Sequence, residues 1–316
     1  MSAKKDVDGR DKPGHDGRVM IPPSHPADAR RARLTGIALM CGAVGCFAFL
    51  DADAKYLGRH MDVLEVVWAR YTFAFIFALA WSNPITRPGM LVSARPGLQI
   101  ARSTLLLGST ALNFFAIKYL QLDQALTITF STPFLVAALA GPALGEWVGP
   151  RRWAAIGVGF VGVLVVTRPG FNAIHPAAAL SAGGALCYAL YALATRILAR
   201  TDSNETTLFY SNLVGFVAML PIVGFVWTPP DSLLIGLLML AAGGLASLGH
   251  YLLIFAHRLA PASVLSPFIY SQLAWTVALG FFVFGDVPNR WTLAGAGIVI
   301  ASGLYLLHRE RVRGPR

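Results

Sequence analysis

The chain has 316 residues, of which 55% are hydrophobic and only 13% are charged, and its mean hydropathy is +0.58. A soluble domain carries about 25% charged residues, so this composition excludes an ordinary soluble fold. The net charge of +10 would suit nucleic-acid binding, but the basic residues lie between apolar runs, and we predict no nucleic-acid partner. The cysteines Cys41, Cys46 and Cys187 all fall inside apolar runs, which predicts neither a disulfide framework nor a metal site.

Residues 1–33 are rich in Gly, Pro, Asp, Lys and Arg, which predicts a disordered cytoplasmic tail. Ten apolar runs follow, most of them near the roughly 20 residues that cross a ~30 Å hydrocarbon layer. In chain order they cover 34–57, 63–81, 98–119, 123–144, 152–167, 176–199, 207–227, 232–256, 261–284 and 291–307. We therefore predict an all-α integral membrane protein with ten transmembrane helices, ending in a basic cytoplasmic tail over 309–316.

The basic residues are distributed unevenly between the two sides of these spans. If the N-terminus is cytoplasmic, 20 Lys and Arg lie inside and five outside, with Arg70 within a span. Cytoplasmic loops carry such an excess of positive charge. The sequence therefore predicts a multi-pass protein of the inner membrane with both termini in the cytoplasm and the lipid bilayer as its surroundings.

The two halves of the chain resemble each other. Residues 116–146 align on 256–286 without a gap, so that Lys118 meets Arg258 and Glu146 meets Asp286. After a short gap, Trp153 meets Trp291. Five helices then form each repeat, over 34–168 and 175–308, and an odd number gives the two copies opposite orientations. Inverted repeats of this kind are typical of secondary transporters.

The same residues carry a family resemblance. The Gly-Glu and Gly-Asp pairs at 145–146 and 285–286, each followed by an Arg/Trp pair and a Gly-rich helix, resemble the EamA-type repeats of the drug/metabolite transporter superfamily. The stretches 50–58, 65–70, 266–273 and 302–307 are similar to a bacterial subgroup that includes S-adenosylmethionine and riboflavin uptake carriers. This resemblance implies transport of a small organic metabolite.

Ionisable residues near the outer ends of the first two helices are the first candidate site. Asp51 lies about 25 Å along its helix and Arg70 about 10 Å into the next, which gives similar depths. Such groups inside a membrane usually face a cavity or pair with one another. Asp51 or Asp53 is therefore expected to form a substrate or proton site with Arg70. The alternatives are a structural ion pair, snorkelling to the headgroups, or pairing of Asp51 with Lys55 along one helix face.

Polar residues beside prolines in helices four and nine form the second candidate cluster. Because an interior proline frees a backbone carbonyl, matched breaks in two helices often mark a carrier site. The alternative is hydroxyl-mediated helix packing. The cluster comprises Thr127, Thr129, Ser131, Thr132 and Pro133 in helix four, and Ser266, Pro267, Tyr270, Ser271 and Gln272 in helix nine.

Further candidates are single residues within the spans. Trp68, Tyr188, Tyr191, Tyr270 and Trp275 could stack on a flat substrate ring, although each could equally be an interfacial or packing aromatic. Asn113 and His250 are polar groups in mid-span that could line a cavity, and His250 could instead serve only as hydrogen-bonded structure.

Two patterns are interpreted as structural. Residues 157–162 match the dinucleotide-binding pattern GxGxxG, but they lie inside an apolar run with no preceding strand. Their partners in the repeat, Gly295 and Gly297, favour close helix packing. Glu146 and Asp286 end equivalent helices, which predicts a capping or turn role.

The sequence thus predicts a secondary carrier without cofactor, metal or enzymatic activity, driven by a proton or a counter-solute. Uptake of a nucleoside-like or vitamin-like compound is the first hypothesis, and export of amino acids or toxic metabolites is the second. A non-transporting membrane interaction protein is the remote alternative. No nucleophile–base motif supports an enzyme, and no long soluble loop supports a scaffold.

Overall fold

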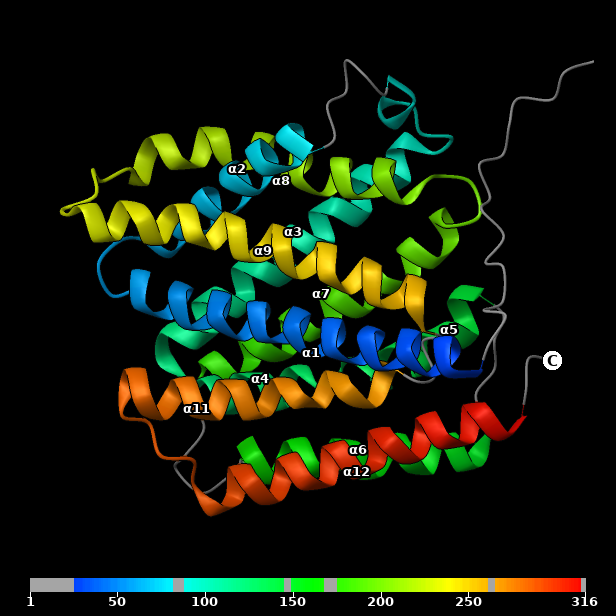
Figure 1. The fold of residues 1–316 in the computed structure, drawn as a ribbon. Helices are drawn as coiled ribbons and strands as arrows, with labels where there is room; N and C mark the ends of the chain where they lie inside the picture. Colours follow the sequence, from blue (N-terminus) through cyan, green and yellow to red (C-terminus); the bar gives the residue numbers. More distant parts are fainter. Residues whose placement is uncertain (1–25, 82–87, 145–148, 168–174, 261–264, 314–316) are drawn as a thin grey trace, which may run out of the picture.

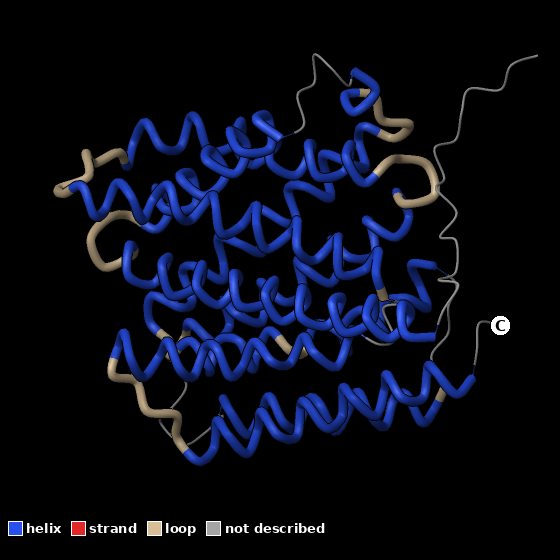
Figure 2. Tube along the Cα trace, viewed as in Figure 1, coloured by secondary structure: helices blue, strands red, loops and turns tan. Residues whose placement is uncertain are grey.

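The computed structural model describes residues 26–81, 88–144, 149–167, 175–260 and 265–313. Within these ranges every regular element is helical, and Figure 2 shows no strand. The longer helices lie side by side in one bundle (Figure 1). The elements are α1 (Pro26–Leu57), α2 (Val63–Trp81), η1 (Pro88–Leu91), α3 (Pro96–Tyr119), α4 (Leu122–Thr129), α5 (Thr132–Leu144), α6 (Pro150–Thr167), α7 (Ala177–Leu198), α8 (Asn204–Val226), α9 (Leu233–Leu259), η2 (Ser266–Ser271), α11 (Gln272–Phe284) and α12 (Arg290–Arg313).

The two terminal helices are longer than predicted. Helix α1 begins at Pro26 rather than at 34, and α12 continues to Arg313, so the tails predicted over 1–33 and 309–316 are partly helical. The segment 27–33 consists of Ala, Arg and one Asp, and since Ala and Arg are good helix formers, the helix continues beyond the apolar span. The remainder of the predicted N-terminal tail lies outside the described residues.

Two of the predicted spans are interrupted. The fourth divides into α4 and α5 at residues 130–131, and in the described part of the ninth the 3₁₀ segment η2 precedes α11. Helix α5 begins at Thr132 and α11 begins at Gln272, which are equivalent positions in the alignment of 116–146 on 256–286. The proline-containing helices therefore break at the same place in both halves.

Among the described residues, seven segments are long and apolar enough to cross a membrane, and 153–166 and 268–284 are shorter apolar helices. Large apolar side chains point outward, such as Phe225 and Phe282 with 91% and 81% of their surface exposed, whereas many core positions are Ala. Membrane bundles pack small residues between helices and place large apolar residues against lipid. The chain is thus a multi-pass helical membrane protein.

The helices pair across the two halves of the chain. Helix α1 packs along α9, and α3 packs along α7; α6 lies against α12, and α2 against α8. In Figure 1 the α6–α12 pair is at the bottom edge of the bundle and the α2–α8 pair is at the top. The start of α1 and the end of α12 lie at the same end of the bundle, called here the terminal end.

Glycines allow the closest of these approaches. A Cβ atom on Gly162 would lie 2.9 Å from the Gly295 carbonyl oxygen, and one on Gly295 would lie 2.6 Å from the Gly162 oxygen. Gly159 lies against the Phe134 ring. The GxGxxG pattern is therefore a packing motif, as predicted. Gly157 and Gly297 are exceptions, because open space surrounds their Cβ positions.

Candidate functional site

A hydrogen bond between α1 and α3 forms the centre of the candidate site. Asn113 Nδ2 donates to Asp51 Oδ1 at 3.0 Å, so two of the predicted site residues are in contact. The second Asp51 oxygen accepts no hydrogen bond from the described residues, and Asp51 and Asn113 both remain partly exposed in the interior of the bundle. Polar side chains within a membrane span are costly, and they usually face an interior cavity or pair with one another.

Arg70 on α2 is the most unusual side chain of the site. Only 6% of its surface is exposed, and Nε and Nη1 are buried without a hydrogen-bond partner among the described residues. Its guanidinium lies over the Tyr71 ring, 4.4 Å from the ring centroid, and it attracts the Asp51 carboxylate without forming a direct ion pair. Buried guanidinium groups are usually paired, so an arginine without hydrogen-bond partners among the described residues is a candidate binding group.

His250 on α9 adjoins the same interior. Its Nδ1 donates to the Ala246 carbonyl at 2.7 Å, and its ring meets the edge of Phe47 with centroids 5.1 Å apart. The positive charges of Arg70 and Arg102 both act on the His250 ring electrostatically. Asp51, Arg70, Asn113 and His250, from four helices, together form the interior polar cluster.

Asp53, the alternative to Asp51, lies apart from this cluster. Its side chain is buried, and neither carboxylate oxygen has a hydrogen-bond partner among the described residues. No interaction with Arg70 accompanies it, in contrast to Asp51. Of the two aspartates, Asp51 is the one that interacts electrostatically with Arg70.

Arg102 was missed by the sequence analysis, which counted it only among the basic residues of the cytoplasmic side. It is 2% exposed and ties α3 to α7 and α8 through neutral partners: Thr195 Oγ1 at 2.6 Å, Ser211 Oγ at 2.8 Å, the Thr207 carbonyl at 3.1 Å and Tyr191 Oη at 2.8 Å. Tyr188 packs beside Tyr191, with ring centroids 5.2 Å apart. The predicted aromatic Tyr188 thus adjoins Arg102.

A polar anchor lies beyond Arg102, in the turn between α7 and α8. Asp202 accepts hydrogen bonds from the Ser93 hydroxyl, the Ala94 N–H at 3.0 Å and Gln99 Nε2 at 2.8 Å. Burial disfavours the charged carboxylate, but these hydrogen bonds outweigh that effect and lower the pKa of Asp202 below its usual value. The anchor holds the start of α3 against this turn.

The interrupted helices place their polar residues differently from the prediction. Thr129 Oγ1 donates to the Ala125 carbonyl at 3.0 Å, within its own helix, and Pro133 is exposed at the start of α5. Tyr270 meets Phe130 edge-to-face at 5.1 Å and packs on Gly303. These contacts join the two interruptions to each other and to α12, which favours the packing alternative for Thr129 and Tyr270.

Three other predicted residues lie outside the interior polar cluster. Trp68 packs edge-to-face against Trp227 at the end of α8, 5.3 Å away, although its Nε1 has no hydrogen-bond partner among the described residues. Trp275 lies beside Phe49 and Gly45 of α1 and is 42% exposed. Gln272 is partly buried at the first turn of α11.

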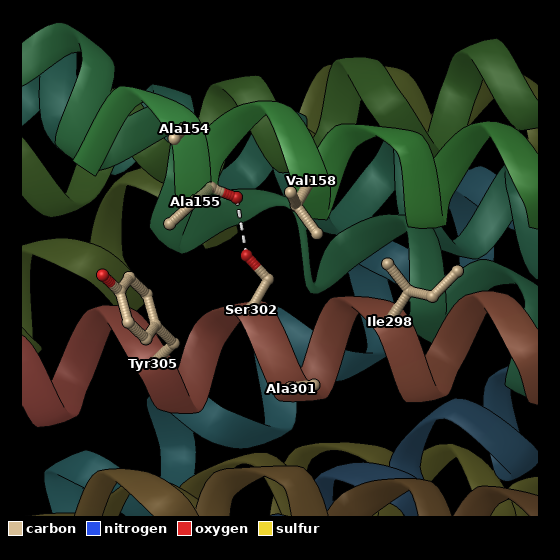
Figure 3. Close-up of a pocket in the computed structure, with 7 residues that line it drawn as sticks. All are labelled: Ala154, Ala155, Val158, Ile298, Ala301, Ser302 and Tyr305. Atoms are coloured by element: carbon tan, nitrogen blue, oxygen red, sulfur yellow. Dashed lines mark hydrogen bonds between the residues drawn. The ribbon is translucent and has the colours of Figure 1, made fainter. Parts of the chain in front are cut away.

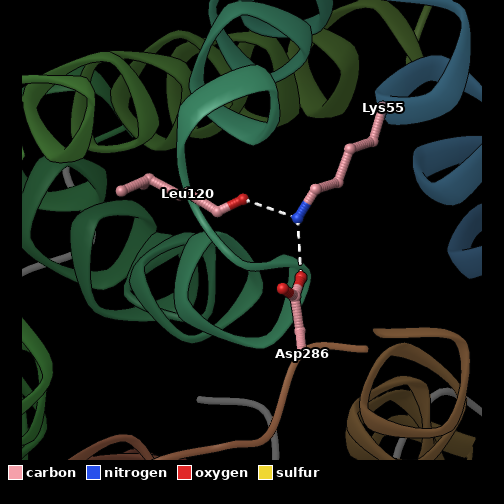
Figure 4. A network of polar contacts seen from close by, with 3 residues as sticks. All are labelled: Lys55, Leu120 and Asp286. Carbon is pink, nitrogen blue, oxygen red and sulfur yellow. Dashed lines mark hydrogen bonds and ion pairs between the residues drawn. The ribbon is translucent and has the colours of Figure 1, made fainter. Parts of the chain in front are cut away.

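Lys55 does not pair with Asp51, as one alternative supposed. Its Nζ donates to Asp286 Oδ2 at 2.8 Å and to the Leu120 carbonyl at 3.0 Å, which ties α1 to the α3–α4 junction and to the end of α11 (Figure 4). Asp286 also lies in the turn predicted for it. Gly285 ends α11 with a left-handed φ of +70°, and the N–H of Asp286, the next residue, donates to the Gly280 carbonyl. Glu146, its partner in the repeat, lies outside the described residues.

Two hollows lie away from the interior polar cluster. One of about 510 Å³ is an open, apolar groove between α6 and α12, where the Ser302 hydroxyl donates to the Ala155 carbonyl at 2.6 Å (Figure 3). A smaller hollow of about 210 Å³ is lined by the α1–α2 and α8–α9 connections, including His60, Asp62 and Asp231. We place the site at the polar cluster, because the large groove lacks charged groups to select a solute. No group of metal ligands occurs among the described residues.

Comparison with known proteins agrees with this picture. A model of the EamA-like transporter family matches residues 34–168 and 175–307. The chain is 27% identical to the S-adenosylmethionine uptake transporter of Rickettsia conorii, over 90% of this chain and 96% of the relative. It is 26% identical to the riboflavin transporter of Vibrio cholerae, again over 90% and 96%.

A solved crystal structure shares the fold at 16% identity and a TM-score of 0.58, over 91% of this chain and 99% of that chain. Most of the chain matches the family model, in two stretches that hold the helices described above except the start of α1 and the end of α12. The chain therefore belongs to the EamA-like transporter family.

Proposed function

We propose that the protein is a secondary carrier that moves a small organic metabolite across the inner membrane by exposing an interior site to each side in turn. The observation that carries this proposal is the interior polar cluster, in which charged groups from α1 and α2 lie inside the bundle with Asn113 of α3 and His250 of α9. Charged side chains so deep in a membrane are costly and mark solute or ion pathways.

Ten transmembrane helices in two inverted halves, 34–168 and 175–308, are part of the proposal. The packing of α1 on α9 is matched by that of α7 on α3, as a two-fold relationship between the halves requires. The equivalent interruptions before Thr132 and Gln272 also support it, as do the two stretches matched by the family model. Two equivalent halves can rock about a central site, which gives alternating access.

Orientation and energy source follow from charge. The start of α1 and the end of α12 lie at the terminal end of the bundle. In the sequence, most basic residues fall in segments on the same side of the predicted spans as the termini. Both termini are therefore assigned to the cytoplasm. The sequence carries no ATP-binding motif, so uphill transport would draw on a proton or a counter-solute.

The substrate is assigned to the nucleoside-like or vitamin-like class, by likeness to the S-adenosylmethionine and riboflavin carriers. Thermal unfolding of the detergent-purified protein with S-adenosylmethionine, riboflavin and aromatic amino acids tests this assignment. Ligand at ~100 times its Kd stabilises the folded state by about 2.7 kcal/mol, and the compound that does so should be taken up by liposomes containing the protein.

A shift with aromatic amino acids alone would favour the exporter hypothesis. A compound that binds the protein but does not cross the liposome membrane would contradict the proposal that the protein is a carrier. Liposomes prepared without protein serve as the control, because they measure passive leakage of the same compound.

A further inference from the structure

The interior polar cluster contains a cation, Arg70, without hydrogen-bond partners among the described residues, and a carboxylate, Asp51, that accepts a hydrogen bond at only one oxygen. Arg70 offers Nε and Nη1 without partners among the described residues, and Asp51 offers the oxygen that Asn113 does not occupy. Arg70 and Asp51 attract each other electrostatically but form no direct ion pair, so neither satisfies the hydrogen-bonding groups of the other. The cluster therefore holds a buried donor edge on Arg70 and an Asp51 oxygen that no described residue occupies.

Contacts on α2 and α3 fix this arrangement. Tyr71 Oη lies 3.2 Å from Thr110 Oγ1, which seats α2 on α3, and the Arg70 guanidinium lies on the Tyr71 ring. Asn113 follows Thr110 by less than one helical turn and holds Asp51. Arg70 and Asp51 are thus positioned from the same stretch of α3.

We propose that Arg70 and Asp51 bind the α-amino-acid end of a zwitterionic substrate, with the carboxylate on Arg70 and the ammonium group on Asp51. This inference rests on the proposed carrier function and narrows its substrate class. The planar edge of a guanidinium matches a carboxylate with two parallel hydrogen bonds. A phosphate would suit Arg70 alone, but Asp51 would repel its second charge, whereas a zwitterion satisfies both groups.

Two adenosine compounds that differ only in this end provide the test. S-Adenosylhomocysteine and 5′-methylthioadenosine share adenine, ribose and a thioether, but only the first carries an α-amino acid. Binding of each would be measured by thermal shift and calorimetry on the full-length purified protein, for wild type, Arg70→Gln and Asp51→Asn. Arg59→Gln is the matched control, because Arg59 is exposed and packs on Phe284 rather than in the cluster.

Wild type is expected to bind S-adenosylhomocysteine at least about tenfold more tightly than 5′-methylthioadenosine, as charged hydrogen bonds of ordinary strength require. Arg70→Gln and Asp51→Asn should each remove most of that preference, while Arg59→Gln retains it. Arg70→Gln removes no hydrogen bond to the described residues and takes away a buried charge, so it should fold with an unchanged or higher Tm.

Equal binding of the two compounds by wild type would overturn the inference, even if a variant failed to fold. So would a preference that persists in Arg70→Gln, or the absence of binding by every zwitterion among S-adenosylmethionine, S-adenosylhomocysteine and the standard amino acids. In that last case, a shift with riboflavin or 5′-methylthioadenosine would leave the proposed function standing. A lack of binding by any of these compounds would count against both.

Discussion

Lys55 of α1 and Asp286 beyond α11 form a 2.8 Å ion pair, although 231 residues separate them in the chain. The Lys55 side chain is almost fully buried, and Phe284 covers it with its ring centroid 4.8 Å from Nζ. Because the ammonium group also holds the Leu120 carbonyl, this contact joins three helix ends opposite the terminal end.

Removing the anion from this pair should destabilise the fold. Asp286→Ala leaves the buried Lys55 ammonium bonded only to the neutral Leu120 carbonyl, with the Asp123 carboxylate attracting it without a direct contact. Removing one partner of a buried ion pair costs up to about 3–5 kcal/mol. Since 23% of the Asp286 side chain is exposed, we expect a smaller loss, which should lower the Tm in detergent.

Lys55→Met in the Asp286→Ala background should restore part of the lost Tm, because it removes the unpaired charge. An Asp286→Ala protein with wild-type Tm would show that the pair contributes nothing to stability. Asp231→Ala is a suitable control, since that exposed carboxylate lies at the same end of the bundle.

Two glycines of α12 should respond oppositely to the same substitution. Gly295→Ala places a methyl group 2.6 Å from the Gly162 carbonyl oxygen, so α6 and α12 must separate. Overpacking of this kind costs roughly 1–3 kcal/mol. Gly297→Ala meets open space and should stabilise α12 slightly, since alanine is the better helix former. Thermal unfolding of both variants decides the point, and equal Tm changes would contradict the close crossing.

The Asp202 anchor should make stability depend on pH. Because the folded state lowers the pKa of Asp202, its stabilisation is fully present above the unfolded value of about 3.9 and is lost as the pH falls through the folded pKa. Wild type should therefore have a higher Tm than Asp202→Asn at pH 7, and the difference should shrink below about pH 4. A difference that stays constant down to pH 3 would refute this role.

Arg102 should not be replaceable by lysine. Its guanidinium reaches acceptors on α7 and α8 at once, whereas a lysine ammonium is a single point and cannot reproduce the fork. Arg102→Lys should lose about 1–3 kcal/mol, as buried acceptors go unsatisfied, and the Tm should fall by several degrees. Arg95→Lys is the matched control, because Arg95 is exposed at the start of α3. Equal Tm values for the two variants would contradict the prediction.

The sequence alone predicted most of the helices and the interruptions near Pro133 and Pro267. Both follow from local properties: apolar length must match the hydrocarbon layer, and proline removes a backbone donor. Self-similarity also assigned Asp286 to a helix-ending turn, which the left-handed Gly285 now explains. Helix ends were less predictable, since the Ala/Arg segment before 34 continues the helix without being apolar.

For the candidate site, the sequence singled out Asp51, Arg70, Asn113 and His250, among other residues, because polar residues are rare and costly within a span. It could not decide which of them meet. That Asp51 takes Asn113 as its partner, that Lys55 takes Asp286, and that Arg102 is buried at a helix junction all depend on how distant helices pack. Hydropathy reports the depth of a residue in the membrane, whereas its neighbours are set by interhelical packing, which only the tertiary structure specifies.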